Sequence, residues 1–149
     1  MTHVICPHCA ATNRVAPDRP AAAAKCGNCH APLFEGKPLE VDEAGFARHL
    51  RPDGLPVLLD VWAPWCGPCR AMAPAFARAA AALEPDMRLL KLNADEAPSV
   101  SAQLGVRGIP AMFLFRDGKV IAQTAGAMDT SSIVAWARRH LPATAGRAA

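Results

Sequence analysis

Six cysteines are the residues whose type and spacing point most directly to chemistry in this 149-residue sequence. They fall into three Cys-x-x-Cys pairs with none left over, at positions 6 and 9, 26 and 29, and 66 and 69. Pairs with this spacing bind metals or exchange disulfides. The N-terminus shows no basic stretch followed by an apolar run, so we expect no secretory signal and a cytoplasmic protein. Because thiols in a reducing compartment are more often metal ligands or redox catalysts than structural disulfides, each pair is interpreted from its surroundings.

The first two pairs lie in residues 1–37, a segment with few aliphatic side chains and many turn-forming residues. Such a segment cannot bury enough apolar surface to fold without a cross-link or a metal. The two pairs are separated by 16 residues. This matches the spacing of zinc sites in which four thiolates complete a closed tetrahedron. We predict one zinc ion in this segment, held by Cys6, Cys9, Cys26 and Cys29.

Other interpretations of these four cysteines stay open at this point. Two structural disulfides would require an oxidising compartment. A redox role for Cys6 and Cys9 would need a preceding strand and a following amphipathic helix, and we expect neither. His8 or His30 could replace one cysteine as a zinc ligand, although four cysteines already satisfy the metal.

The third pair, Cys66 and Cys69, follows an apolar run at 56–62 that predicts a buried strand and precedes a pattern that predicts a helix. Unpaired N–H groups and the dipole at a helix N-terminus lower the pKa of a thiol there. A second cysteine one turn later can resolve the mixed disulfide that the first one forms. We predict Cys66 as the attacking nucleophile and Cys69 as the more shielded resolving thiol. The alternative, half of a zinc site, would need two more ligands, and this half of the chain offers none at ligand spacing.

The elements that must position this pair are predicted from hydrophobic periodicity and turn signals. From about Leu39 they are a strand at 39–41, a helix at 42–50, a strand at 56–62, a helix extending to 83, a strand at 87–92, a short helix ending at 105, two strands at 111–115 and 120–124, and a helix at 129–141. This order predicts an α/β fold in which helices cover both faces of a mixed sheet. We predict this domain over residues 38–142, followed by a disordered tail at 143–149. His49 and His140 are expected at the surface or at helix ends.

The motif Trp65-Cys-Gly-Pro-Cys69 and four further segments resemble the thioredoxin family in order and spacing. These segments are Asp60–Trp65, Lys91–Asp95, Arg107–Pro110 and Gly126. The resemblance covers about Leu39 to Leu141 and implies a thioredoxin fold. The cysteine pairs of the first 37 residues, with Leu33–Gly36, extend it to the zinc-binding thioredoxin-2 type of bacteria.

The resemblance also implies roles for single residues. Asp60 corresponds to the buried acid beneath the active site, and a carboxylate in an apolar strand has its pKa raised by desolvation. It could then take the proton of Cys69, although a structural aspartate is the alternative. Lys91 resembles the lysine that pairs with this acid, and Pro110 resembles the cis-proline of the family. The resemblance implies a substrate-binding rim that consists of Trp65, Gly67, Pro68, Ile109, Pro110 and Gly126.

These roles predict a protein-disulfide reductase with no tightly bound organic cofactor. As the resemblance implies, an NADPH-dependent thioredoxin reductase would recharge it, and disulfide-containing client proteins would be its substrates. The alternative is a zinc-controlled, redox-sensitive binding module or holdase on a thioredoxin scaffold. The net charge is only +3 and the basic residues are scattered, so we expect no nucleic-acid binding. We also expect a monomer, and no stretch approaches the roughly 20 apolar residues of a membrane-spanning helix.

Overall fold

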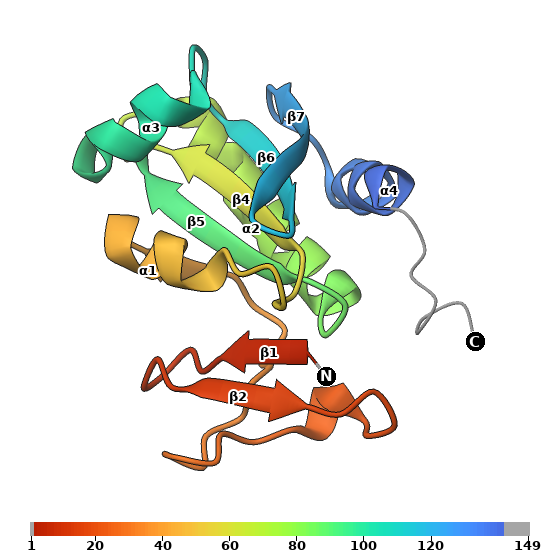
Figure 1. The fold of residues 1–149 in the computed structure, drawn as a ribbon. Helices are drawn as coiled ribbons and strands as arrows, with labels where there is room; N and C mark the ends of the chain where they lie inside the picture. The colour runs from red at the N-terminus through yellow and green to blue at the C-terminus, as the bar shows by residue number, and fades with distance from the viewer. Residues whose placement is uncertain (1, 142–149) are drawn as a thin grey trace.

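The computed structural model describes residues 2–141, which form a five-stranded sheet with its helices and a smaller two-stranded sheet (Figure 1). The strands are β1 (Thr2–Ile5), β2 (Thr12–Val15), β3 (Leu39–Val41), β4 (Val57–Trp62), β5 (Arg88–Asn93), β6 (Ala111–Arg116) and β7 (Lys119–Ala125). The helices are α1 (Glu43–His49), α2 (Gly67–Leu83), α3 (Pro98–Leu104) and α4 (Thr130–His140), with short 3₁₀ helices η1 (Ala21–Ala23) and η2 (Ala94–Glu96). The predicted tail at 143–149 and the predicted domain end at 142 lie outside the described residues.

The larger sheet has the strand order β3-β5-β4-β6-β7. Its central strand β4 runs parallel to β5 and antiparallel to β6. Leu58 packs in one core with residues of α2 and α4, whereas Leu59 packs in a second core with residues of α1 and α3. Helices therefore cover both faces of a mixed sheet, which confirms the predicted α/β fold and explains why β4 is apolar along nearly its whole length (Figure 1).

The predicted ends of several elements are also present. The carboxylates of Asp42 and Asp129 accept backbone N–H groups at the starts of α1 and α4. Gly105 ends α3 in the left-handed conformation, with φ of 66°. Asp117 and Gly118 both have positive φ, which a tight hairpin turn between β6 and β7 requires.

Residues 2–37 form a unit that we call the four-cysteine module. Sequence reasoning expected no strand before Cys6, and this expectation was wrong. Residues 2–5 form β1, because their backbone pairs antiparallel with residues 12–15 in β2. The chain thus turns back as a hairpin after Cys6 and Cys9 and does not continue into a helix, so the strand–turn–helix context of a redox pair is absent here.

The module packs against the larger domain through the buried side chain of Arg88, which is 2% exposed. The Arg88 guanidinium donates to the carbonyl oxygens of Ile5 (3.2 Å) and Leu33 (2.8 Å), and its Cζ atom lies 4.8 Å from the centre of the Phe34 ring. It also pairs with Glu84 at 2.9 Å. A single side chain of β5 therefore satisfies carbonyl groups on both halves of the module.

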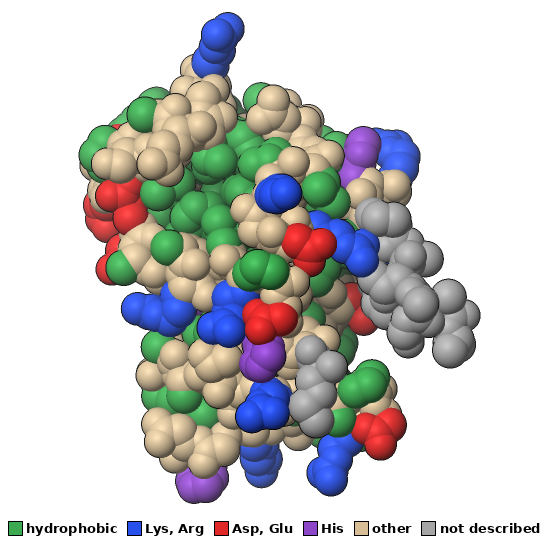
Figure 2. Space-filling view, in the orientation of Figure 1, with side chains coloured by type: hydrophobic (Ala, Val, Ile, Leu, Met, Phe, Trp, Pro, Cys, Tyr) green, Lys and Arg blue, Asp and Glu red, His purple; other side chains and the backbone are tan. Residues whose placement is uncertain are grey.

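Charged side chains lie along this junction on one face of the molecule (Figure 2). Figure 2 shows charged side chains and a histidine where the module meets the larger domain, in keeping with the ion pairs of Asp53 with Arg51 and His3. His49 was expected at the surface or at a helix end; it is the last residue of α1, and its side chain is buried. The last turn of α1 faces the module, and His49 lines a small cavity there together with Arg88.

Candidate active site

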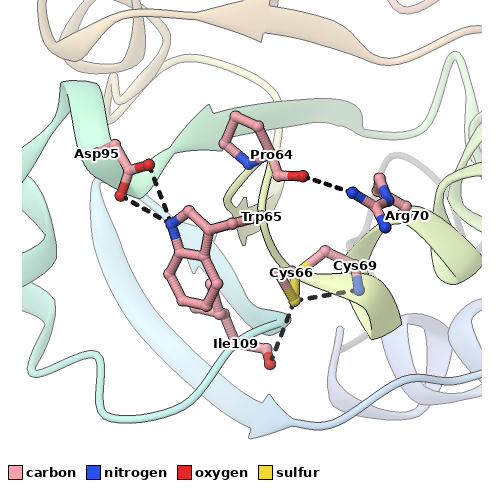
Figure 3. Close-up of a disulfide and its surroundings, with 7 residues drawn as sticks. All are labelled: Pro64, Trp65, Cys66, Cys69, Arg70, Asp95 and Ile109. Atoms are coloured by element: carbon pink, nitrogen blue, oxygen red, sulfur yellow. Dashed lines mark hydrogen bonds between the residues drawn. A yellow bond between two sulfur atoms is a disulfide. The ribbon is translucent and has the colours of Figure 1, made fainter.

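Cys66 and Cys69 form a disulfide at the start of α2, and their Cα atoms are 5.3 Å apart (Figure 3). Cys66 is the N-cap of α2, and the backbone N–H of Cys69 donates to its Sγ at 3.2 Å. Pro68 lies in the first turn, where its missing N–H leaves no helix hydrogen bond unmade. The helix start therefore directs an N–H donor and the positive end of its dipole at the sulfur of Cys66.

The two cysteines differ little in exposure. Cys66 is 4% exposed and Cys69 is 3% exposed, so the expected stronger shielding of Cys69 is not seen in the disulfide form. They form a small apolar cluster with Ala63, against which Trp62 and Ile109 pack. The N-cap position of Cys66, and not its exposure, is what distinguishes the two thiols.

The segment before β6 reaches the disulfide from the other side. The Ile109–Pro110 peptide bond is cis, as the resemblance implied. The Ile109 carbonyl oxygen lies 3.8 Å from Cys66 Sγ (Figure 3), and the N–H of Gly126 donates to the Pro110 carbonyl at 2.8 Å. The fold therefore brings Ile109, Pro110 and Gly126 together beside Cys66.

Trp65 and Gly67 flank the same disulfide. Trp65 is 68% exposed, and its indole N–H donates to both carboxylate oxygens of Asp95, at 3.1 and 3.2 Å (Figure 3). A Cβ atom added at Gly67 would meet no other group within 4 Å. The backbone next to the disulfide is thus open, with a large apolar surface beside it that could contact an extended chain.

Asp60 lies on the face of β4 that α2 covers, since it shares that face with Leu58. It is 1% exposed, and burial raises the pKa of Asp60 to about 7. Lys91, its register partner on β5, opposes this rise in pKa, and the charge of Glu40 adds to it. Neither carboxylate oxygen of Asp60 has a hydrogen-bond partner among residues 2–141. Lys91 therefore acts on Asp60 through its charge and not through a hydrogen bond.

The four cysteines of the module converge on one point. Their sulfur atoms all lie within 4.8 Å of one another, and the Cys6–Cys29 and Cys9–Cys26 sulfur pairs are each 3.6 Å apart. Four sulfurs placed tetrahedrally at about 2.3 Å from zinc would be about 3.8 Å apart. The four free thiols thus fit the donor set and the size of a zinc site.

Both turns that carry these cysteines have the same backbone pattern. The residue after the second cysteine, Ala10 or His30, has positive φ and donates its N–H to the carbonyl of the first cysteine. Cys26 Sγ accepts N–H groups from Cys29 and Asn28 and from the side chain of Asn13. These donors lower the pKa of Cys26 to about 5, which favours the thiolate that a metal needs.

The histidine alternatives gain no support from the geometry. His8 Nε2 lies 2.6 Å from a carboxylate oxygen of Glu35. Over residues 2–141, the single group of three or more potential metal ligands close together consists of the four cysteines alone.

Comparison with known proteins assigns the chain to a family. The profile described as Thioredoxin matches residues 37–139. The chain belongs to the thioredoxin family. The profile described as Thioredoxin 2, N-terminal, matches residues 5–31. Thioredoxins are protein-disulfide oxidoreductases, and the Cys66–Cys69 disulfide of this thioredoxin fits the active site of the family.

Individual relatives agree with this assignment. Thioredoxin C-3 of Corynebacterium nephridii is 36% identical over 138 residues, covering 93% of this chain and 94% of that protein. Thioredoxin 1 of Synechococcus elongatus is 38% identical over 101 residues, which are 68% of this chain and 94% of that protein. A mutant thioredoxin from Halobacterium salinarum superposes with a TM-score of 0.66 at 27% identity, covering 74% of this chain and 96% of that structure. The thioredoxin fold expected from the sequence is confirmed.

Several residues near the two sites were not singled out from the sequence. Asp95 accepts the Trp65 indole N–H, Glu40 accepts the Trp62 indole N–H at 2.9 Å, and Arg88 joins the module to the domain through the carbonyls of Ile5 and Leu33. Each contact joins residues at least 22 positions apart or on different elements. The pattern of neighbouring residues in the sequence therefore could not predict any of them. Among residues 2–141, no helix combines the length and apolar character needed to cross a membrane.

Proposed function

We propose that this thioredoxin reduces disulfides of client proteins with Cys66 as nucleophile. In the reduced form, the Cys66 thiolate attacks one sulfur of a client disulfide. A Cys66–client disulfide forms, the client disulfide breaks, and the departing client sulfur takes up a proton. The observation that carries this assignment is the N-cap position of Cys66, whose sulfur receives the Cys69 N–H at 3.2 Å.

In the second step Cys69 loses its proton and attacks Cys66 Sγ. The Cys66–Cys69 disulfide forms, the mixed disulfide breaks, and the second client sulfur leaves as a thiolate that takes up a proton. We assign the proton acceptor to Asp60, through a water molecule, because its raised pKa of about 7 suits a base at neutral pH. Lys91 sets the charge balance of this carboxylate. Overall, the Cys66–Cys69 dithiol is oxidised to a disulfide, and the client disulfide is reduced to two thiols.

The client chain is proposed to lie across the surface beside Cys66. Trp65, Pro68 and Ile109 offer apolar contact, Gly67 and Gly126 leave room for a backbone, and the Pro110 segment borders the sulfur. We further propose that an NADPH-dependent thioredoxin reductase recharges the oxidised pair. A cytoplasmic location and a monomeric state remain part of this proposal.

Two single variants test the order of attack. Cys69→Ser should accumulate a stable mixed disulfide with insulin, because Cys66 attacks an insulin disulfide and no second thiol is present to resolve the adduct. Cys66→Ser, the matched variant, should trap none and should lose insulin reduction in the presence of reductase and NADPH. Mass spectrometry of the non-reduced protein reads the adduct. Trapping by Cys66→Ser instead of Cys69→Ser would overturn the assignment.

We also propose that residues 1–37, which include the four-cysteine module, hold one structural zinc ion through Cys6, Cys9, Cys26 and Cys29, ahead of a thioredoxin domain at 38–142. The support is the fit of the four sulfurs to a tetrahedron and the profile match over residues 5–31. When bound, zinc would link the two cysteine turns, and its binding free energy would stabilise the folded form of a segment with a small core. No contact within residues 2–141 favours a separate holdase role.

Zinc content per chain tests the ligand set. The purified protein should contain one zinc per chain by atomic emission, and Cys26→Ser should lose most of it. His30→Gln, which changes the neighbouring exposed side chain, should retain the metal. Equal zinc loss in both variants would favour a histidine ligand over the four-cysteine set.

A further inference from the structure

Three charged residues lie side by side across three strands of the main sheet. Lys91 on β5 is the register partner of Glu40 on β3 and of Asp60 on β4. Paired residues on neighbouring strands direct their side chains to the same face, here the face that α2 covers. Two strand spacings place the backbones of Glu40 and Asp60 about 10 Å apart with Lys91 between them.

Trp62 joins the outer carboxylate to this row. It lies two residues after Asp60 on β4 and therefore shares its face. The Trp62 indole N–H donates to Glu40 Oε2 at 2.9 Å, and the Lys91 ammonium lies 4.8 Å from the centre of the Trp62 ring. The indole is thus held by Glu40 on one side and contacted by the Lys91 cation on its face.

We propose that Glu40 is a positioning residue for the buried Asp60: it holds the Trp62 indole and shares the Lys91 ammonium with the Asp60 carboxylate. Glu40 is on the edge strand and exposed, whereas Asp60 is fully buried. The positive charge of Lys91 therefore acts on two carboxylates and not one. This inference rests on the proposed function, in which Asp60 accepts the proton of Cys69.

The effects of the neighbouring charges on the pKa values of Asp60 and Glu40 have the signs that a shared Lys91 requires. The pKa of Asp60 is raised first by burial, is lowered by Lys91, and is raised again by Glu40. Partial desolvation raises the pKa of Glu40 as well. The hydrogen bond from Trp62 and the charge of Lys91 lower this pKa, and the charge of Glu96 raises it. Besides Glu96, the titratable or charged side chains that line the cavity next to Glu40 are Cys6, His8, Asp42, Arg48 and His49.

Glu40→Gln tests the role because the amide oxygen can still accept the Trp62 N–H while the charge is removed. Two readouts apply: the carboxyl carbon resonance of Asp60 against pH, and the pH profile of Cys69 attack on a Cys66 mixed disulfide. Removing a charge about 10 Å away should lower both midpoints by about 0.3 to 1 pH unit. Glu35→Gln, in the module, should leave both midpoints in place.

Glu40 could raise the pKa of Asp60 by drawing on the charge of Lys91 or by direct repulsion between the two carboxylates. The Lys91→Met variant separates these two effects. If Glu40 acts through Lys91, Glu40→Gln should produce a clearly smaller shift in the Lys91→Met background than in the parent protein. An equal shift in both backgrounds, or no shift in the parent, would overturn the inference. Asp60→Asn is measured separately, and full-speed Cys69 attack in that variant would reject Asp60 as the base. The Asp60 carboxyl resonance of the protein that keeps Asp60 would still report the effect of Glu40→Gln.

Discussion

At the scale of single residues, Asp60 shows a conflict between stability and chemistry. Its carboxylate is buried in the strand that leads to the active-site pair and has no hydrogen-bond partner among the described residues. Because desolvation disfavours the charged form, the pKa of Asp60 rises to about 7. A group of this kind destabilises the folded protein when ionised, and that property also makes it able to accept a proton at neutral pH.

Asp60→Asn should therefore stabilise the protein above pH 7. Relative to an aspartate of pKa 3.8, the folded state of the parent holds the proton to higher pH. The contribution of Asp60 to stability is therefore fully present below about pH 4 and is lost as the pH rises through 7. The difference amounts to at most about 4 kcal/mol. Denaturant unfolding at several pH values measures it.

In the Asn variant the fall in stability between pH 4 and 7 should largely disappear. Asp18→Asn, at an exposed position, serves as the control and should leave the pH profile of the parent intact. A parent protein whose unfolding free energy stays level over this range would contradict the raised pKa.

At the scale of elements, β5 serves both sites. Lys91 on this strand lies beside Asp60, and Arg88, three residues earlier, holds the four-cysteine module. Burial lowers the pKa of Arg88 and raises the pKa of Glu84, and each partner opposes the shift of the other. Since a buried ion pair roughly offsets its own desolvation, the pair fixes the position of the module more than it adds to stability.

Arg88→Met should destabilise the protein by about 3 kcal/mol or more, because Glu84 loses its partner and the carbonyls of Ile5 and Leu33 lose their donor. Thermal or denaturant unfolding measures the loss. The double variant Arg88→Met, Glu84→Gln should recover part of it, since no buried charge is then left unpaired. A double variant no more stable than Arg88→Met alone would contradict the account in which the unpaired Glu84 causes part of the loss.

At the scale of the whole molecule, the chain has cores of two kinds. Two large clusters lie on either side of the main sheet, and a small one within the module contains Val4, Cys6, Cys26, Leu33 and Phe34. Two of the five buried members of the small core are themselves proposed metal ligands. The module should thus depend on the metal, while the main domain has enough apolar contact to fold around its own sheet.

Removing zinc with a chelator should unfold the module and leave the active-site disulfide functional. Limited proteolysis followed by mass spectrometry should show new cleavage within residues 2–37 and little elsewhere. Reduction of the Cys66–Cys69 disulfide by dithiothreitol should proceed at a rate within a few-fold of that of the zinc-loaded protein. Equal resistance of residues 2–37 to protease with and without zinc would contradict a structural metal.

Much of the domain was predictable from the sequence because its signals are local. The apolar run at β4, the periodicity of α2, the caps at Asp42 and Asp129 and the Asp117-Gly118 turn each act within a few residues. The β1–β2 hairpin escaped prediction because its strands have four residues each and its stability comes from the module around it.

The sequence by itself determined the chemistry available: three Cys-x-x-Cys pairs, one at a strand–helix junction and two in a turn-rich segment. Only the tertiary structure decided what surrounds them. Glu40 beside Trp62, Asp95 beside Trp65 and Arg88 beneath the module are contacts between elements distant along the chain. Such contacts depend on strand register and helix docking, which arise from the packing of the whole core. No periodic pattern in the sequence therefore predicts them.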